Sequence, residues 1–193
     1  MDDRRDEFLL EMYKQVSNHL NRHIVGNWQF LGVLAGAVGF LALVDKKILS
    51  LDYAASIVIA ICAWLVANSL DASNWFNRNI NIISNIERQF LTLKDIKEIH
   101  PYINVHKDPG SIISFFKIQI GLGIAISTLI LLYHFYETVL PYIGCPYTEL
   151  QFVKCLPYMT EVLAIFLCCK LWKKYQAHDK YFEDNSPGKV LLK

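Results

Sequence analysis

The stretch NSLDASNWFNRNINIISNIERQFLTL, from Asn68 to Leu93, decides the architecture of this chain. It follows an apolar run long enough to cross a membrane and continues at helical spacing into polar sequence. A membrane helix that extends unbroken out of the bilayer carries its surface side chains on a stiff rod. The stretch therefore predicts an all-α, polytopic membrane protein whose second span extends into the cytoplasm.

Within this stretch the apolar and polar side chains separate onto two faces of one helix. The apolar face holds Phe76, Asn79, Ile80, Ile83, Ile86, Phe90 and Leu93. We predict that the other face binds a partner or ligand; it holds Asn77, Arg78, Asn81, Asn85 and Arg88. Asn is a mediocre helix former, whereas Asn and Arg side chains bind carbonyls, carboxylates and phosphates. A contact between subunits, or a solvated face, is the alternative.

The composition of the whole chain favours a membrane location. Of its 193 residues, 53% are hydrophobic and only 19% are charged, which is unusual for a soluble domain of this size. The formal net charge of +1 argues against direct nucleic-acid binding, which needs a clustered basic surface. The first 27 residues are too polar for a cleavable signal, so we expect internal segments to anchor the chain.

Four segments are candidates for membrane spans. Three of them carry no charge and have the required length of roughly 17 to 25 residues: Trp28 to Val44, Tyr53 to Leu70, and Ile118 to Tyr136. The fourth, Cys155 to Trp172, is interrupted by Pro157, Glu161 and Lys170. It is predicted to be a fourth span whose end charges reach the interface, with a re-entrant helix as the alternative.

The distribution of basic residues sets the orientation. With four spans, 16 of the 19 Lys and Arg residues fall on the side that holds both termini. We therefore predict an inner-membrane protein with both termini in the cytoplasm. The predicted parts are a cytoplasmic amphipathic helix at 1–27, a transmembrane hairpin at 28–70, a cytoplasmic helical extension and turn at 71–110, spans three and four at 111–172 with an outer loop at 137–154, and a cytoplasmic tail at 173–193.

The N-terminal amphipathic helix is the expected packing partner of the apolar face, since both lie on the same side of the membrane. His19 and His23 lie four residues apart on this helix, but no third ligand is near, so we predict no metal site. The extension after the second span is expected to end near His100, because Pro101 disfavours helical geometry in the residue before it.

Small residues predict close contacts between membrane helices. They are Gly32, Gly36 and Gly39 in the first span, Ala60, Ala63 and Ala67 in the second, and Gly121, Gly123 and Ala125 in the third. These contacts can join helices within one chain or between subunits.

Four polar side chains are expected within the membrane: Asn68, Gln119, His134 and Glu161. Polar groups at this depth either line a water path or hydrogen-bond between helices, and the sequence leaves both interpretations open.

Cys145 of the outer loop and Cys155 directly after the loop form a disulfide or remain two independent thiols. We find no phosphate-binding loop, nucleophile elbow, zinc-protease helix or paired-cysteine motif. The sequence therefore predicts no catalytic site, no cofactor and no enzyme, although a lipid-directed site on Glu161 and His134 is the alternative.

Two segments flank the first two spans, LLEMYKQVSNHLNRH before them and WFNRNINIISNIERQFL after them. Over residues 7 to 95 this layout resembles the SLATT class of bacterial membrane effectors. The four-span size is similar to the membrane accessory proteins of the antiphage systems RADAR and Kiwa and of some RNA-targeting CRISPR loci. The resemblance implies a homo-oligomeric antiphage effector or sensor in the inner membrane. Such a protein acts as a gated pore or membrane disruptor, or as a non-conducting scaffold that recruits a cytosolic protein through the 71–100 helix.

Overall fold

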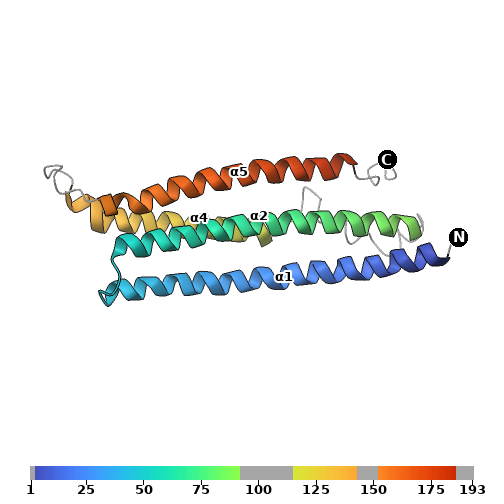
Figure 1. Cartoon of the computed structure of the whole chain (residues 1–193), viewed down its shortest axis with the longest axis horizontal. Helices are drawn as coiled ribbons and strands as arrows, with labels where there is room; N and C mark the ends of the chain where they lie inside the picture. Colours follow the sequence, from blue (N-terminus) through green and yellow to red (C-terminus); the bar gives the residue numbers. More distant parts are fainter. Residues whose placement is uncertain (1–2, 92–114, 143–151, 186–193) are drawn as a thin grey trace. The chain divides into compact units, whose positions relative to one another are not determined.

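The computed structural model describes residues 3–91, 115–142 and 152–185 (Figure 1). These residues are helical except for the connection at 46–50 and Leu91. The long helices are α1 (Asp3–Asp45), α2 (Leu51–Phe90), α4 (Phe115–His134) and α5 (Leu156–Asn185). Short helical turns follow α4 and precede α5: η2 (Phe135–Val139), η3 (Leu140–Tyr142) and η5 (Phe152–Cys155).

Within the described residues, four helical stretches are long and apolar enough to cross a membrane, as the sequence predicted. The stretch that contains α5 is one of them, although Pro157, Glu161 and Lys170 interrupt its sequence. Pro157 is the second residue of α5, where a proline removes a backbone donor that has no partner inside the helix. Pro157 is therefore compatible with the first turn of α5 and does not interrupt the helix.

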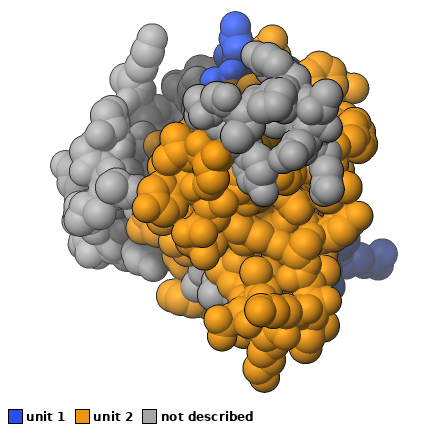
Figure 2. All heavy atoms as spheres, turned by 90° about the vertical axis from the view of Figure 1, so that its left-hand side faces the viewer, with its two compact units in different colours: residues 1–27, 71–114, 174–193 blue, residues 28–70, 115–173 orange. Residues whose placement is uncertain are grey.

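The chain forms two compact units, which Figure 2 distinguishes by colour. Unit 1 consists of residues 1–27, 71–114 and 174–193, and unit 2 consists of residues 28–70 and 115–173. The helices α1, α2 and α5 each contribute residues to both units.

In unit 2, α2 is the most buried helix. An apolar segment of 18 residues in α2 is 56% buried, whereas the corresponding segment of the stretch that contains α5 is 11% buried. The core of the unit is apolar and contains Leu34, Ala37, Ala55, Val58, Ile59, Cys62, Leu65 and Ile130. The outward side of α5 is apolar too, since Val162 and Phe166 are largely exposed. An apolar surface around an apolar core is what a lipid environment favours.

The first two spans form the predicted hairpin within unit 2. The connection between α1 and α2 is short and tight, and Lys47 in it adopts a left-handed backbone with φ of 58°. Phe30 of α1 packs edge-on against Trp64 of α2, with ring centroids 5.2 Å apart.

In unit 1, the beginning of α1 contacts the end of α2. Tyr13 Oη donates to Glu87 Oε1 at 3.1 Å, Arg5 donates to Gln89, and the His23 ring lies nearly parallel to Trp75. These contacts join the N-terminal segment to the end of α2, and Ile80, Ile83 and Ile86 of the predicted apolar face are buried. The N-terminal segment is the first part of the continuous helix α1 and not a separate helix.

The extension ends earlier than predicted. Helix α2 ends at Phe90, and the Leu91 amide donates to the Glu87 carbonyl at 2.8 Å to complete the last turn. Pro101 restricts only the residue before it, so it limits how far a helix can run and does not set where this one stops.

Candidate functional site: a polar seam along α4

One face of α4 is buried and carries polar residues at regular intervals. The buried residues of α4 follow each other at steps of three and four, which places them on one face: Phe116, Gln119, Gly123, Ser127, Ile130 and His134. Three of the six are polar, in a helix that is otherwise strongly apolar. Each therefore needs a hydrogen-bond partner inside the bundle.

The first polar contact joins α4 to α2. Ser69 Oγ donates to Gln119 Oε1 at 3.2 Å, and both residues are almost completely buried. A serine and an amide side chain that share a hydrogen bond in an apolar interior fix the register of the two helices that carry them.

The second contact joins α4 to α5. Ser127 Oγ donates to Glu161 Oε2 at 2.5 Å. One helical turn earlier, Gly123 lets α4 approach α2: a Cβ atom at this position would lie 3.1 Å from Val66 Cγ2 and 3.4 Å from the Cys62 carbonyl oxygen. The contact between Ser127 and Glu161 therefore lies one turn of α4 from the close contact between α4 and α2.

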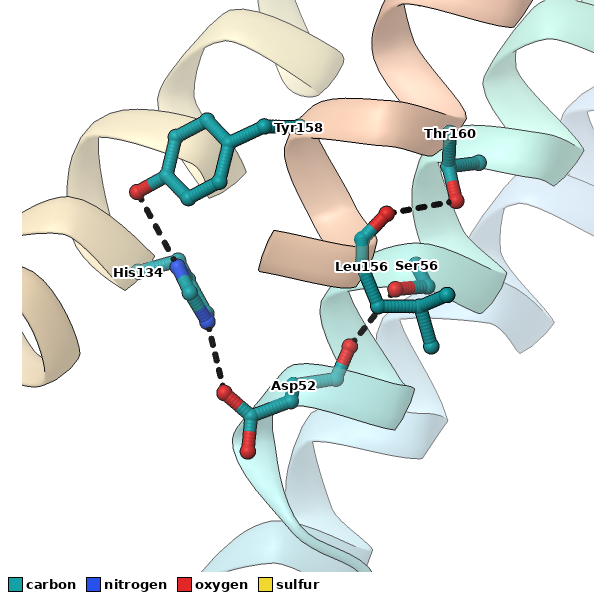
Figure 3. A network of polar contacts seen from close by, with 6 residues as sticks. All are labelled: Asp52, Ser56, His134, Leu156, Tyr158 and Thr160. Carbon is teal, nitrogen blue, oxygen red and sulfur yellow. Dashed lines mark hydrogen bonds and ion pairs between the residues drawn. The ribbon is translucent and has the colours of Figure 1, made fainter. Parts of the chain in front are cut away.

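The third contact joins all three helices (Figure 3). His134 is completely buried; its Nε2 lies 2.9 Å from Asp52 Oδ1, and its Nδ1 lies 3.1 Å from the Tyr158 hydroxyl. A neutral imidazole that donates from Nε2 accepts the Tyr158 proton at Nδ1, so one tautomer satisfies all three side chains. A protonated imidazole donates to both partners instead.

The contact lies where two helix ends meet. Asp52 is in the first turn of α2 and His134 in the last turn of α4. The neighbouring hydroxyls are engaged elsewhere, because Ser56 donates to the Asp52 carbonyl at 2.7 Å and Thr160 to the Leu156 carbonyl at 2.9 Å (Figure 3).

We call these three contacts the polar seam; its residues are Asp52, Ser69, Gln119, Ser127, His134, Tyr158 and Glu161. From Gln119 to His134 the seam follows 15 residues of α4, or about 22 Å at 1.5 Å per residue. A bilayer's hydrocarbon core is about 30 Å thick. The seam therefore covers most of the length of a membrane span.

The structure brings together three of the four predicted intramembrane polar residues. Gln119, His134 and Glu161 belong to the seam, whereas Asn68 donates to the Trp64 carbonyl of its own helix at 2.8 Å. Sequence reasoning missed Ser69 and Asp52, because small hydroxyls and residues at a span's end carry no signal of their own. Asp52 directly precedes the predicted second span, and Ser69 directly follows the predicted site residue Asn68.

The predicted partner face is partly covered by α5 within unit 1. Asn77 Nδ2 donates to the Tyr175 hydroxyl at 3.2 Å and to Asp179 Oδ1 at 3.1 Å. The segment predicted as a tail at 173–193 is therefore helical up to Asn185 and lies against α2. Sequence reasoning missed this contact, since the polar end of α5 shows no apolar periodicity.

The remaining residues of that face differ in their surroundings. Arg78 is exposed, and its guanidinium lies 5.0 Å from the centre of the Trp75 ring. Asn81, Asn85 and Arg88 are half-buried. Among the residues that the structure describes, the buried Asn81 Nδ2 and Asn74 Oδ1 atoms have no hydrogen-bond partner.

Of the five predicted packing glycines, Gly123 makes a close contact with α2 and the other four are open in this structure. A Cβ atom added at Gly32, Gly36, Gly39 or Gly121 would meet nothing within 4 Å, in contrast to Gly123. Of the predicted disulfide, Cys155 is described and its thiol is free, while Cys145 lies outside the described residues. His19 and His23 belong to no group of three potential metal ligands in the described ranges.

Comparisons of this chain with known protein families, with curated proteins and with solved structures find no match.

Proposed function

We propose that this chain is a gated, membrane-permeabilising protein whose helices α2, α4 and α5 form the closed state of a polar path. The polar seam carries this proposal. Ionisable and amide side chains are costly within a bilayer, and where they occur they commonly mark the path of an ion or a proton.

The seam has the properties of a closed path. Its polar groups pair with one another across the helix interface, including one oxygen of each carboxyl. Movement of α4 away from α2 and α5 would separate these pairs and line the new gap with an amide, two carboxyls, an imidazole and hydroxyls. Such a gap admits water and small ions, whereas the same movement of apolar helices would not.

In the setting that the SLATT resemblance implies, the protein acts as an oligomeric effector in the bacterial inner membrane during antiphage defence. The predicted orientation has both termini in the cytoplasm, so that cytoplasmic unit 1 receives the trigger and the spans of unit 2 respond.

The test is ion and proton flux from liposomes that contain the purified chain. Ser127→Asp sets a second carboxyl against Glu161, and repulsion between the two should open the seam and make the liposomes leak. Ser127→Ala is the matched control, because it removes the same hydrogen bond without adding charge. Liposomes that stay tight with Ser127→Asp, although the variant inserts as well as the control, contradict the proposal.

The second candidate is a non-conducting scaffold or sensor that recruits a cytosolic partner through the 71–100 helix. It is favoured by Arg78, which is an exposed residue of the predicted partner face, and by the exposed Trp75 beside it. Substitution of Asn81, Asn85 and Arg88 together by Ala should abolish activity in the native host while liposome flux stays unchanged. Activity that survives the triple substitution contradicts this candidate.

A further inference from the structure

One exposed face of α5 changes from apolar to basic within a single helical turn. The residues of this face follow each other at steps of three and four, which places them along one side of the helix: Val162, Leu163, Phe166, Lys170, Lys173 and Lys174. All six side chains are exposed. We call the last three the lysine cluster.

The opposite face of α5 is the one that packs against other helices. Glu161, Cys168 and Tyr175 lie seven residues apart, so they share a face about half a turn around the helix from the lysine cluster. Glu161 contacts α4, whereas Cys168 and Tyr175 contact α2. The lysine cluster therefore lies on the side of α5 that faces away from these helices.

The positive charge of the lysine cluster is not neutralised by neighbouring acids. Within the described part of the chain, none of the three lysines has an ion-pair partner. Glu161 and Asp179 lie on the packed face, where they contact Ser127 and Asn77. Asp184 lies ten residues beyond Lys174, or about 15 Å along the helix. The cluster is thus a site of concentrated positive charge that an anion complements.

The dimensions of this face match one leaflet's headgroup layer. From Lys170 to Lys174 the helix rises by about 6 Å. The headgroup layer on each side of a bilayer is about 5–7 Å thick. The apolar residues Val162, Leu163 and Phe166 precede the cluster on the same face, at the depth of the acyl chains if the lysines lie at the headgroups. The predicted orientation places the cluster at the cytoplasmic leaflet.

We propose that this face of α5 binds an anionic phospholipid. The ammonium groups of the lysine cluster donate charge-assisted hydrogen bonds to the headgroup phosphate, and the acyl chains lie along Val162, Leu163 and Phe166. Basic residues at the cytoplasmic end of a span attract anionic lipid in this way. The site rests on the membrane insertion that the proposed function also assumes, but it does not require a polar path.

Native mass spectrometry of the full chain in detergent tests the site by counting retained lipids. After mixing with equal amounts of phosphatidylglycerol and phosphatidylcholine, the original chain should retain phosphatidylglycerol preferentially. Lys170→Gln, Lys173→Gln and Lys174→Gln together should lower its retention at least about tenfold and leave that of phosphatidylcholine unchanged. Arginine at the same three positions keeps the charge and should preserve retention. Unchanged retention in the glutamine variant overturns the proposal.

The matched control removes the same charge elsewhere. Lys14→Gln, Lys46→Gln and Lys47→Gln together change three exposed lysines that do not belong to α5. This variant should retain phosphatidylglycerol as the original chain does. A loss equal to that of the lysine-cluster variant would mean that net charge and not this face retains the lipid, and it would overturn the proposal.

A soluble headgroup distinguishes a lipid from a free phosphate compound. Glycerophosphoglycerol carries the phosphate without acyl chains, so it should displace little phosphatidylglycerol even at about tenfold excess. Displacement at equal concentration would assign the lysine cluster to a soluble phosphate and overturn the lipid site. Lipid retention is measured without flux, so a chain that leaks but retains no phosphatidylglycerol contradicts this site alone, whereas tight liposomes contradict only the polar path.

Discussion

Two regions of this molecule use similar hydrogen bonds in opposite surroundings. The polar seam of unit 2 has four buried side chains, Ser69, Gln119, Ser127 and His134, whereas its other three residues are half-buried. In unit 1, Asn77 bonds Tyr175 and Asp179 at 3.1 to 3.2 Å, and all three residues are half-buried. Bond lengths therefore do not rank these contacts. The loss of a partner should cost more where the side chain is fully buried, because water cannot replace that partner there.

The largest effect is expected from the seam. His134→Ala removes the partner of the half-buried Asp52 carboxyl and Tyr158 hydroxyl, and it leaves a cavity in place of a completely buried side chain. The free energy of unfolding should fall by about 2–3 kcal/mol, through the lost hydrogen bonds and the cavity. Thermal and denaturant unfolding in detergent micelles measures this loss.

His178→Ala is the control for this substitution, because His178 is an exposed histidine of α5 in unit 1. It should change stability by less than about 0.5 kcal/mol, as surface substitutions do. Equal losses for the two histidines would remove the distinction between the regions.

The second prediction concerns packing beside the seam. Gly123→Leu forces a side chain into the contact with Val66 and Cys62, and overpacking of this kind costs about 1–3 kcal/mol. Gly121→Leu, two residues away on an open face of the same helix, should be tolerated. Unfolding in micelles compares the two variants directly, and similar losses would place the close contact elsewhere.

The third prediction concerns unit 1. Asn77→Ala removes both hydrogen bonds to α5, but water replaces them, so the loss should be about 1 kcal/mol. Hydrogen exchange should become faster in α5 from Tyr175 to Asn185 and stay unchanged around His134. Lys180→Ala, an exposed change on the same helix, should leave both regions unaltered. Faster exchange around His134 would mean that the two regions are not independent.

The sequence predicted the helical class and the four apolar helices, because length and the absence of charge determine a span almost alone. It did not predict how polar side chains pair. Gln119 and Glu161 stand out in apolar sequence, but their partners Ser69 and Ser127 are common residues whose role depends on which helix faces them. The same holds for Gly121 and Gly123, since only the rotation of α4 decides which glycine meets α2.

The smallest predicted effect tests whether burial disfavours a charged side chain in unit 1. Burial raises the pKa of Glu87 above its usual range, although the hydrogen bond from Tyr13 and the charge of Arg88 oppose this shift. The folded state therefore favours the protonated carboxyl. Its stabilising contribution is complete below the ordinary glutamate pKa of about 4.3 and is lost as pH rises through the raised value.

Glu87→Gln tests this sign. The amide cannot ionise and still accepts from Tyr13, so the variant should melt at a higher temperature than the original chain near pH 7. The difference should shrink as pH falls and vanish below about pH 4, where Glu87 is protonated in both folded and unfolded chains. Glu11→Gln, at an exposed acid of the same unit, should show no pH-dependent difference. If Glu87→Gln stabilises the chain equally at every pH, burial of charge is not the cause, and unit 1 behaves as an ordinary solvated surface.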